Sequence, residues 1–188
     1  TGLIALMMAH RFPNANIDAI EIDSSAYLQA KENVQSSPFA NQIEVNHCSL
    51  QTFSENKKSF DSIVCNPPYF VNSLKSNDNN RTIARHSDTL PFNDLLKGAY
   101  QLLTSNGHFS LVLPIESYCI LEPEAIINGF SINKKVFIKT TPSKQPKRIL
   151  VELSKTPSAY LSSTEYLQEC AGKKSNWYKE ITKEFYLK

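Results

Sequence analysis

The sequence has few cysteines and no long apolar segment, and each absence argues against certain classes of protein. Its four cysteines are widely scattered, with no CxxC pair and no histidine at zinc-ligand spacing. A metal site or a disulfide framework therefore has little support, and reduced thiols in the cytoplasm fit best. No apolar run approaches the roughly 18 residues that a membrane helix needs, and the best, residues 109–115, is strand-sized. We expect a soluble cytoplasmic protein with no metal and no membrane partner.

Charge of one sign is not in large excess either. The chain has 20 Lys and Arg against 18 Asp and Glu, a net charge of +2. So small a net charge does not indicate nucleic-acid binding, although it can hide an uneven distribution. With 41% hydrophobic and 20% charged residues, the composition is that of a globular protein and excludes a disordered or fibrous one. A length of 188 residues suggests one domain of ordinary size, or one domain with a small appendage.

Helical and strand-like patterns alternate along the chain. Helical spacing covers residues 3–11, and Ser24 is predicted to cap a second helix. Short apolar runs predict strands at 17–22 and 60–65, and the alternation of apolar and polar residues at 43–47 predicts another. Farther along we predict a helix at 91–104 stopped by Asn106 and Gly107, a strand at 108–113, a short helix at 123–128, strands at 130–138 and 149–153, and a partly helical segment at 164–188.

This alternation predicts an α/β fold of the Rossmann-like kind, with a mostly parallel sheet and helices on both faces. The strands at 130–138 and 149–153 are predicted to form an antiparallel hairpin at the sheet edge. Ligands of such sheets bind beyond the carboxyl ends of the strands. Glu21, Ser49 and Asn66 each end or follow a predicted strand. We therefore expect the site to lie at these residues.

The sharpest local feature is Asn66-Pro67-Pro68-Tyr69, which follows the strand at 60–65. Two consecutive prolines fix their own φ angles and restrict the residue before them, so Asn66 is held in an extended backbone. Its side-chain oxygen and the Pro67 carbonyl can accept both hydrogens of a planar amino group. The Tyr69 ring offers a stacking face for the ring that carries this group.

On this motif the chain resembles the class I S-adenosylmethionine-dependent methyltransferases that modify amino groups. With Phe70, the following loop and the segment Lys147-Arg148-Ile149-Leu150-Val151-Glu152, it is most similar to the bacterial tRNA(Val) adenine-37 N6-methyltransferase family. The resemblance covers most of the chain. It implies that residues 1–188 form a methyltransferase catalytic domain that is N-terminally incomplete, without the first strand and most of the glycine-rich loop.

The resemblance also implies a set of residues for the cofactor, S-adenosylmethionine. Thr1 and Gly2 match the end of the glycine-rich loop that cradles the methionine part. Glu21 matches the acidic residue that binds the two ribose hydroxyls, because a carboxylate can accept from both. Asp23 is the alternative for this role, although a place as a helix-capping neighbour suits it better. Ser49 stands where the family usually has an aspartate that accepts from the adenine amino group. A hydroxyl gives a neutral interaction there, so the backbone of Leu50 carries more of the adenine recognition.

Basic residues form two groups that could meet RNA phosphate. In the resembling family the loop after the motif does so, which implies RNA-binding roles for Phe70, Arg81, Arg85 and His86. The second group has no acidic residue between Ser131 and Arg148, and we expect it to form a positive patch. Its members are Lys134, Lys135, Lys139, Lys144, Lys147 and Arg148, of which Lys144, Lys147 and Arg148 are the expected RNA contacts.

The implied reaction is transfer of the sulfonium methyl group to N6 of a flipped-out adenine in tRNA. The implied catalytic residues are Asn66, Pro67, Pro68 and Tyr69, and Asn66 is also expected to border the cofactor. We expect a monomer. Three alternatives remain open at this point: a glutamine N5-methyltransferase of release factors, a methyltransferase of DNA adenine or ribosomal RNA guanine, and a non-catalytic RNA-binding module.

Overall fold

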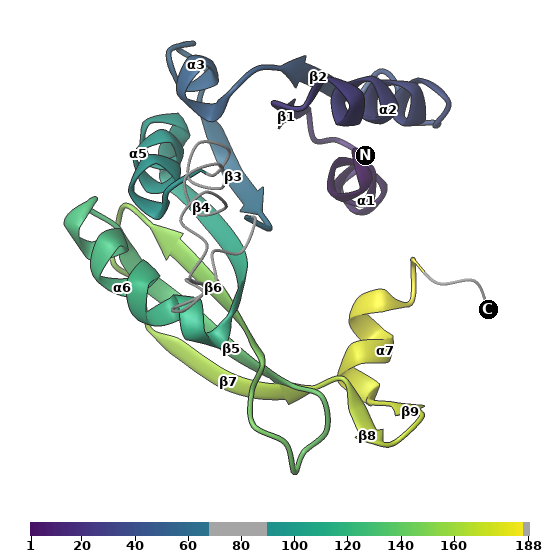
Figure 1. The fold of residues 1–188 in the computed structure, drawn as a ribbon, viewed down its shortest axis with the longest axis vertical. Coiled ribbons are helices and arrows are strands. Elements are labelled where there is room, and N and C mark those ends of the chain that lie inside the picture. The colour runs from purple at the N-terminus through teal and green to yellow at the C-terminus, as the bar shows by residue number, and fades with distance from the viewer. Residues whose placement is uncertain (68–89, 186–188) are drawn as a thin grey trace, which may run out of the picture. The chain divides into compact units, whose positions relative to one another are not determined.

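A computed structural model of the chain describes residues 1–67 and 90–185 (Figure 1). The chain forms two compact units, Thr1–Lys57 and Lys58–Lys188. Each unit has its own sheet.

The first unit contains a two-stranded parallel sheet covered by helices. Its strands pair in register from Ile17 opposite Ile43 to Glu21 opposite His47. Helices α1 and α2 pack on this sheet, and small or branched apolar side chains fill the space between them, including Ala5, Ala9, Val34 and Ile43. The elements are α1 (Leu3–Arg11), β1 (Ile17–Glu21), α2 (Ser24–Gln35), β2 (Ile43–His47) and α3 (Leu50–Ser54).

The cap of α2 is Asp23, and the prediction of Ser24 was wrong by one residue. The Oδ1 atom of Asp23 accepts a hydrogen bond of 2.7 Å from the backbone nitrogen of Ala26, while Ser24 is the first helical residue. Both types are good N-caps. The choice is made by backbone conformation, since Asp23 is extended, with φ −76° and ψ 125°.

The second unit is built on a five-stranded sheet with strand order β3-β4-β6-β5-β7. β3 and β4 are parallel, β6 is antiparallel to both of its neighbours, and β5 is parallel to β7. Four of the five strands therefore run in one direction, which confirms the mostly parallel α/β prediction. The strands are β3 (Phe60–Cys65), β4 (Leu103–Pro114), β5 (Ser131–Lys139), β6 (Arg148–Ser154) and β7 (Leu161–Tyr166).

The predicted antiparallel hairpin is present as β5 and β6, but it does not lie at the sheet edge. β6 pairs with β4 on one side, and β7 pairs with β5 on the other, from Lys134 opposite Leu161 to Lys139 opposite Tyr166. β7 was missed because four of its six side chains are Ser, Thr or Glu and nearly all of them are exposed. An edge strand of this kind lacks the apolar alternation that predicts a strand.

The helices of the second unit differ from prediction at their ends. The helix predicted at 91–104 ends at Leu102, because Leu103 already pairs with Phe60 in the sheet, so Asn106 and Gly107 lie within β4. The helix predicted at 123–128 begins five residues earlier and holds Pro123 in its interior. The remaining elements are α5 (Phe92–Leu102), η1 (Ile115–Ser117), α6 (Tyr118–Ile127), β8 (Gln168–Cys170), β9 (Lys173–Lys174) and α7 (Asn176–Thr182).

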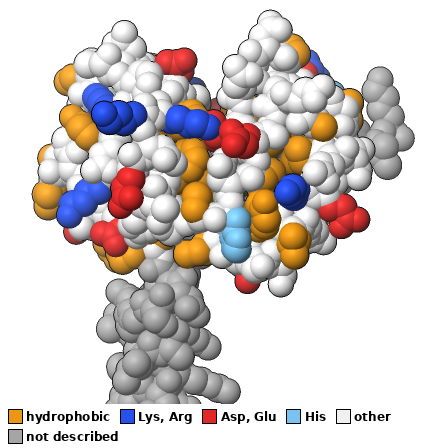
Figure 2. All heavy atoms as spheres, turned by 90° about the horizontal axis from the view of Figure 1, so that it is seen from above, with side chains coloured by type: hydrophobic (Ala, Val, Ile, Leu, Met, Phe, Trp, Pro, Cys, Tyr) orange, Lys and Arg blue, Asp and Glu red, His pale blue; other side chains and the backbone are white. Residues whose placement is uncertain are grey.

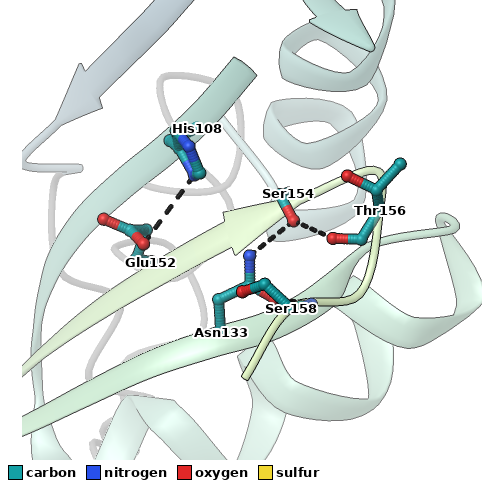
Figure 3. A network of polar contacts seen from close by, with 6 residues as sticks. All are labelled: His108, Asn133, Glu152, Ser154, Thr156 and Ser158. Atoms are coloured by element: carbon teal, nitrogen blue, oxygen red, sulfur yellow. Dashed lines mark hydrogen bonds and ion pairs between the residues drawn. The ribbon is translucent and has the colours of Figure 1, made fainter. Parts of the chain in front are cut away.

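A buried polar network closes the end of the sheet where β6 finishes (Figure 3). The register of β5 shifts between Ile132 and Lys134, leaving Asn133 as an extra residue that is 3% exposed. Its Nδ2 donates to Ser154 Oγ at 2.6 Å, and Ser154 Oγ donates to the Thr156 carbonyl at 2.5 Å. These bonds satisfy buried groups that would otherwise destabilise the bulge.

Candidate active site

Three residues expected to bind the cofactor lie at one edge of the first unit. β1 and β2 are parallel, so their carboxyl ends are adjacent: Glu21 ends β1 opposite His47, and Ser49 follows two residues later. The carboxyl end of α1 leads through residues 12–16 into the start of β1, so the amino end of α1, at Gly2, lies at the same edge as Glu21. The sheet thus brings Gly2, Glu21 and Ser49 together.

Gly2 is the N-cap of α1 and has a left-handed backbone with φ +74°. A Cβ atom added here would lie 3.3 Å from the Cβ of Ala30, so both the conformation and the space favour glycine. The preceding carbonyl, of Thr1, accepts a hydrogen bond of 3.0 Å from the side chain of Asn33. Helix α2 therefore fixes the start of α1, where unpaired backbone N–H groups face outward.

The Glu21 carboxylate is held by the turn that follows it. Its Oε1 accepts from the backbone nitrogen of Asp23 at 3.1 Å. The carbonyl of Ile22 lies 3.2 Å from Nε2 of His47, whose ring stacks on Tyr27 with centroids 4.8 Å apart and planes 15° apart. The turn between β1 and α2 is therefore tied to β2 as well as to its own helix.

The prediction from sequence missed Ile22. Its side chain is 70% exposed although it directly follows the half-buried Glu21. A large apolar side chain left open beside a carboxylate offers a face for a planar apolar group. The signal that could have identified it is an isoleucine placed after the last residue of a strand that ends in an acid.

Ser49 caps α3. Its Oγ accepts from the backbone nitrogen of Thr52 at 3.1 Å and donates to Thr52 Oγ1 at 3.1 Å. A hydroxyl has two acceptor lone pairs, so one remains available for a ligand. The N–H group of Leu50 belongs to the first turn of α3, where backbone donors have no partner within the helix.

Asn66 lies directly beyond the carboxyl end of β3, one residue after Cys65, which pairs with Leu111 of β4. The Asn66 side chain is exposed and Pro67 is buried, so the backbone is anchored just after the asparagine. Burial raises the pKa of the Cys65 thiol to about 11, which keeps it protonated and argues against a nucleophile beside the motif. The other predicted residues of this region lie outside the described part of the chain: Pro68, Tyr69, Phe70, Arg81, Arg85 and His86.

The structure divides the predicted basic cluster. Lys139, Lys144, Lys147 and Arg148 lie at or beyond the carboxyl ends of β4 and β5, the same edge of the second unit as Asn66. Lys135 lies within the sheet, only 15% exposed, and its Nζ is 3.0 Å from Glu122 Oε1. It was wrong to include Lys135 in an open positive patch.

Lys135, Glu122 and Tyr118 form a structural cluster between β5 and α6. The Lys135 Nζ lies 4.6 Å from the centre of the Tyr118 ring, and the Tyr118 hydroxyl donates to Glu122 Oε1 at 2.6 Å. Burial, and then the hydrogen bond to Glu122, raise the pKa of Tyr118 to about 12. Burial alone would lower the pKa of Lys135, but hydrogen bonds with Tyr118 and Glu122 raise it overall, so this lysine stays charged.

Within residues 1–67 and 90–185, no three His, Cys, Asp or Glu side chains are grouped so that they could hold a metal ion. In the same ranges, no helix combines the length and the apolar character that crossing a membrane requires.

Comparison with known proteins identifies the class and then the family. The family described as methyltransferase small domain matches residues 1–118. A predicted O-methyltransferase from Agrobacterium tumefaciens has the same fold, with a TM-score of 0.74 over 97% of this chain and 84% of that one at 16% identity. TrmN from Thermus thermophilus gives a TM-score of 0.59 over 81% of this chain and 40% of that one at 20% identity. The fold is that of a class I methyltransferase.

Curated relatives identify the particular family. A tRNA1(Val) (adenine(37)-N6)-methyltransferase from Parabacteroides distasonis is 46% identical over all of this chain and 80% of its own length. Enzymes of the same name from Bacteroides thetaiotaomicron and Pseudoalteromonas translucida are 39% and 38% identical, again over all of this chain and 79% and 80% of theirs. The chain belongs to the tRNA1(Val) (adenine(37)-N6)-methyltransferase family, which confirms the resemblance found in its sequence.

Proposed function

We propose that this protein is an enzyme that uses S-adenosylmethionine to methylate N6 of adenine 37 in tRNA1(Val). The observation that carries this proposal is the similarity, over the whole chain, to curated enzymes of that name at up to 46% identity. The partner is tRNA. We further propose that the enzyme is a cytoplasmic monomer.

The residues at the edge of the first unit fit the cofactor. Gly2 lets the start of α1 approach Ala30 closely, and the backbone N–H groups in the first turn of α1 suit the methionine carboxylate. Glu21 presents a carboxylate that can accept from both ribose hydroxyls. The adenine would lie against Ile22, with its amino group donating to Ser49 and its ring nitrogen accepting from the Leu50 N–H.

Asn66 is proposed to hold the reacting amine. Its side-chain oxygen and the carbonyl of Pro67 would accept the two N6 hydrogens, turning the nitrogen lone pair away from the adenine plane and toward the methyl donor. Tyr69 would stack on the ring of the target adenine of the tRNA, and Pro68 would stiffen the backbone between Pro67 and Tyr69. When bound, S-adenosylmethionine supplies an electrophilic methyl group on a positively charged sulfur.

The target adenine of the tRNA must leave its stack to reach Asn66, because the methyl group cannot approach N6 in line while the base is stacked in the loop. No strong base is required of the protein, since the amine becomes acidic once it carries the new methyl group. The raised pKa of Cys65 is consistent with this, because a neutral thiol beside Asn66 neither attacks nor accepts a proton.

The proposal is tested by incubating the protein with labelled S-adenosylmethionine and tRNA1(Val) transcripts that carry adenine or guanine at position 37. We expect N6-methyladenine, identified by mass spectrometry of the digested RNA, only from the adenine transcript. Methylation of a release-factor glutamine instead of the tRNA would refute the proposed substrate. Binding of the tRNA without methyl transfer would refute the proposal that the protein is an enzyme.

A further inference from the structure

We propose that residues 139–148, called here the basic finger, bind the phosphate backbone of the tRNA arm that carries the target adenine. This inference rests on the proposed function and deepens it by naming the part of the substrate that is held. The basic finger joins β5 to β6 and extends beyond the ends of both strands (Figure 1).

The charge of the basic finger is of one sign. Its ten residues contain Lys139, Lys144, Lys147 and Arg148, and no acidic residue lies between Ser131 and Arg148. Lys144, Lys147 and Arg148 are exposed. Elsewhere the charges are mixed: on the face drawn in Figure 2, Lys and Arg side chains are interspersed with Asp and Glu. A local potential of one sign attracts a polyanion even when the net charge of the whole protein is small.

Three other lysines of the second unit already have acidic partners. Lys135 is paired with Glu122, while the exposed side chains of Lys173 and Lys183 are paired with carboxylates of their own segments. In the described part of the chain, Lys144 and Lys147 form no such ion pair. Their charges are therefore left for a partner outside the protein.

Backbone hydrogen bonds hold the basic finger in a defined shape. At its base, the Lys147 nitrogen donates to the Ile138 carbonyl at 3.0 Å, and the Ile115 nitrogen donates to the Lys147 carbonyl at 3.2 Å. A turn closes near the tip, where the Lys144 nitrogen donates to the Thr141 carbonyl at 3.1 Å.

The segment that enters β8 supports the other side of the basic finger. The Leu167 and Gln168 nitrogens donate to the carbonyls of Lys139 and Thr140, each at 2.9 Å. A cation on a preorganised backbone loses little conformational entropy on binding, which favours a binding role over that of a flexible solubilising loop.

The position of the basic finger suits the same tRNA arm as the reacting base. Cys65 pairs with Leu111, and Pro114 at the end of β4 pairs with Arg148. Arg148 is therefore two strands away from Asn66 across the sheet, a sideways distance of about 10 Å at the usual strand spacing. A phosphate bound this close to Asn66 belongs to the stem and loop around position 37 rather than to a distant arm.

The test compares two double variants that remove equal charge from the second unit. Lys144→Ala with Lys147→Ala removes two cations of the basic finger, and the control, Lys173→Ala with Lys183→Ala, removes two ion-paired lysines. The readouts are KM for tRNA, kcat at saturating tRNA and the affinity for S-adenosylhomocysteine. For the finger variant we expect KM to rise about tenfold and the slope of log KM against log salt to fall by about 2, since each lysine–phosphate contact contributes about one unit.

We expect kcat and cofactor affinity to stay at wild-type values, and the control variant to behave like the wild type. The same rise in KM should be seen with an RNA hairpin that contains only the anticodon stem and loop. A rise seen with whole tRNA but not with the hairpin would overturn the assignment to this arm. If the finger variant is active and its KM for tRNA is unchanged, the proposed RNA-binding role of the basic finger is overturned. If the wild-type protein methylates no tRNA, the proposed function is refuted instead.

Discussion

Replacing Ser49 with aspartate should tighten cofactor binding. In the structure Ser49 already accepts from the backbone nitrogen of Thr52 at 3.1 Å as the N-cap of α3. Aspartate is an equally good N-cap, and the Thr52 hydroxyl can donate to it where it now accepts from Ser49. The change therefore leaves α3 intact and adds a negative charge where the adenine amino group is proposed to donate.

The size of the effect follows from the two kinds of hydrogen bond. A neutral hydrogen bond contributes about 1 kcal/mol net, and one to a charged acceptor about twice that. The difference of about 1 kcal/mol corresponds to about fivefold tighter binding. Ser49→Ala loses both the cap and the acceptor, so we expect about fivefold weaker binding together with a loss of about 1 kcal/mol of stability.

The assay is calorimetric titration with S-adenosylhomocysteine, alongside thermal unfolding. Asn56→Asp is the matched control, because it places the same charge on an exposed residue of the same unit, beyond the end of α3. We expect this control to bind like the wild type. If Ser49→Asp binds no tighter than Asn56→Asp while unfolding at the wild-type temperature, then Ser49 does not contact the cofactor, and the reasoning fails.

Three further predictions concern the second unit. Asn66→Ala should lower kcat at least about 100-fold while the affinity for S-adenosylhomocysteine stays nearly unchanged. The control is Asn106→Ala, which changes an exposed asparagine of β4 and should leave kcat at the wild-type value. If the kcat of Asn66→Ala equals that of the control, the role of Asn66 is refuted. The hydrogen bond from Tyr118 lowers the pKa of Glu122 below its usual value of 4.5. The ionised Glu122 therefore stabilises the folded protein above pH 4.5, and this stabilisation is lost as the pH falls through the lowered pKa. Melting temperatures of wild type and Glu122→Gln should therefore differ at pH 7 and converge below pH 4.5, and a constant difference would contradict this. Cys65, with its pKa of about 11, should resist iodoacetamide at pH 8 while the exposed Cys119 reacts, as peptide mass spectrometry can show.

The strands that position the site could be predicted because two are short apolar runs bounded by a polar residue, Glu21 or Asn66, and the strand at 43–47 alternates apolar and polar residues. The segments predicted at 17–22, 43–47 and 60–65 are strands β1 at Ile17–Glu21, β2 at Ile43–His47 and β3 at Phe60–Cys65. Knowing that parallel strands share a carboxyl edge was then enough to place Glu21 near Ser49 and to expect Asn66 at the end of its strand.

The features that were missed depend on contacts between distant segments. β7 exists because β5 offers it a partner, and its own side chains carry no strand pattern. Lys135 was grouped with the open lysines because its partner, Glu122, lies 13 residues earlier on a helix whose start was also misplaced. The role proposed for Ile22 depends on its exposure, which a local pattern of residue types does not report.

The reversed direction of β6 has a consequence for how such an enzyme can change its substrate. In a fully parallel sheet each strand contributes one loop to the carboxyl edge, and the chain then crosses over through a helix. Here β5 turns straight back into β6, so this edge gains a hairpin whose two stems are both anchored in the sheet. Its tip can lengthen, shorten or exchange residues during evolution while the strand order and the residues proposed to hold the methyl donor, in a separate compact unit, stay as they are.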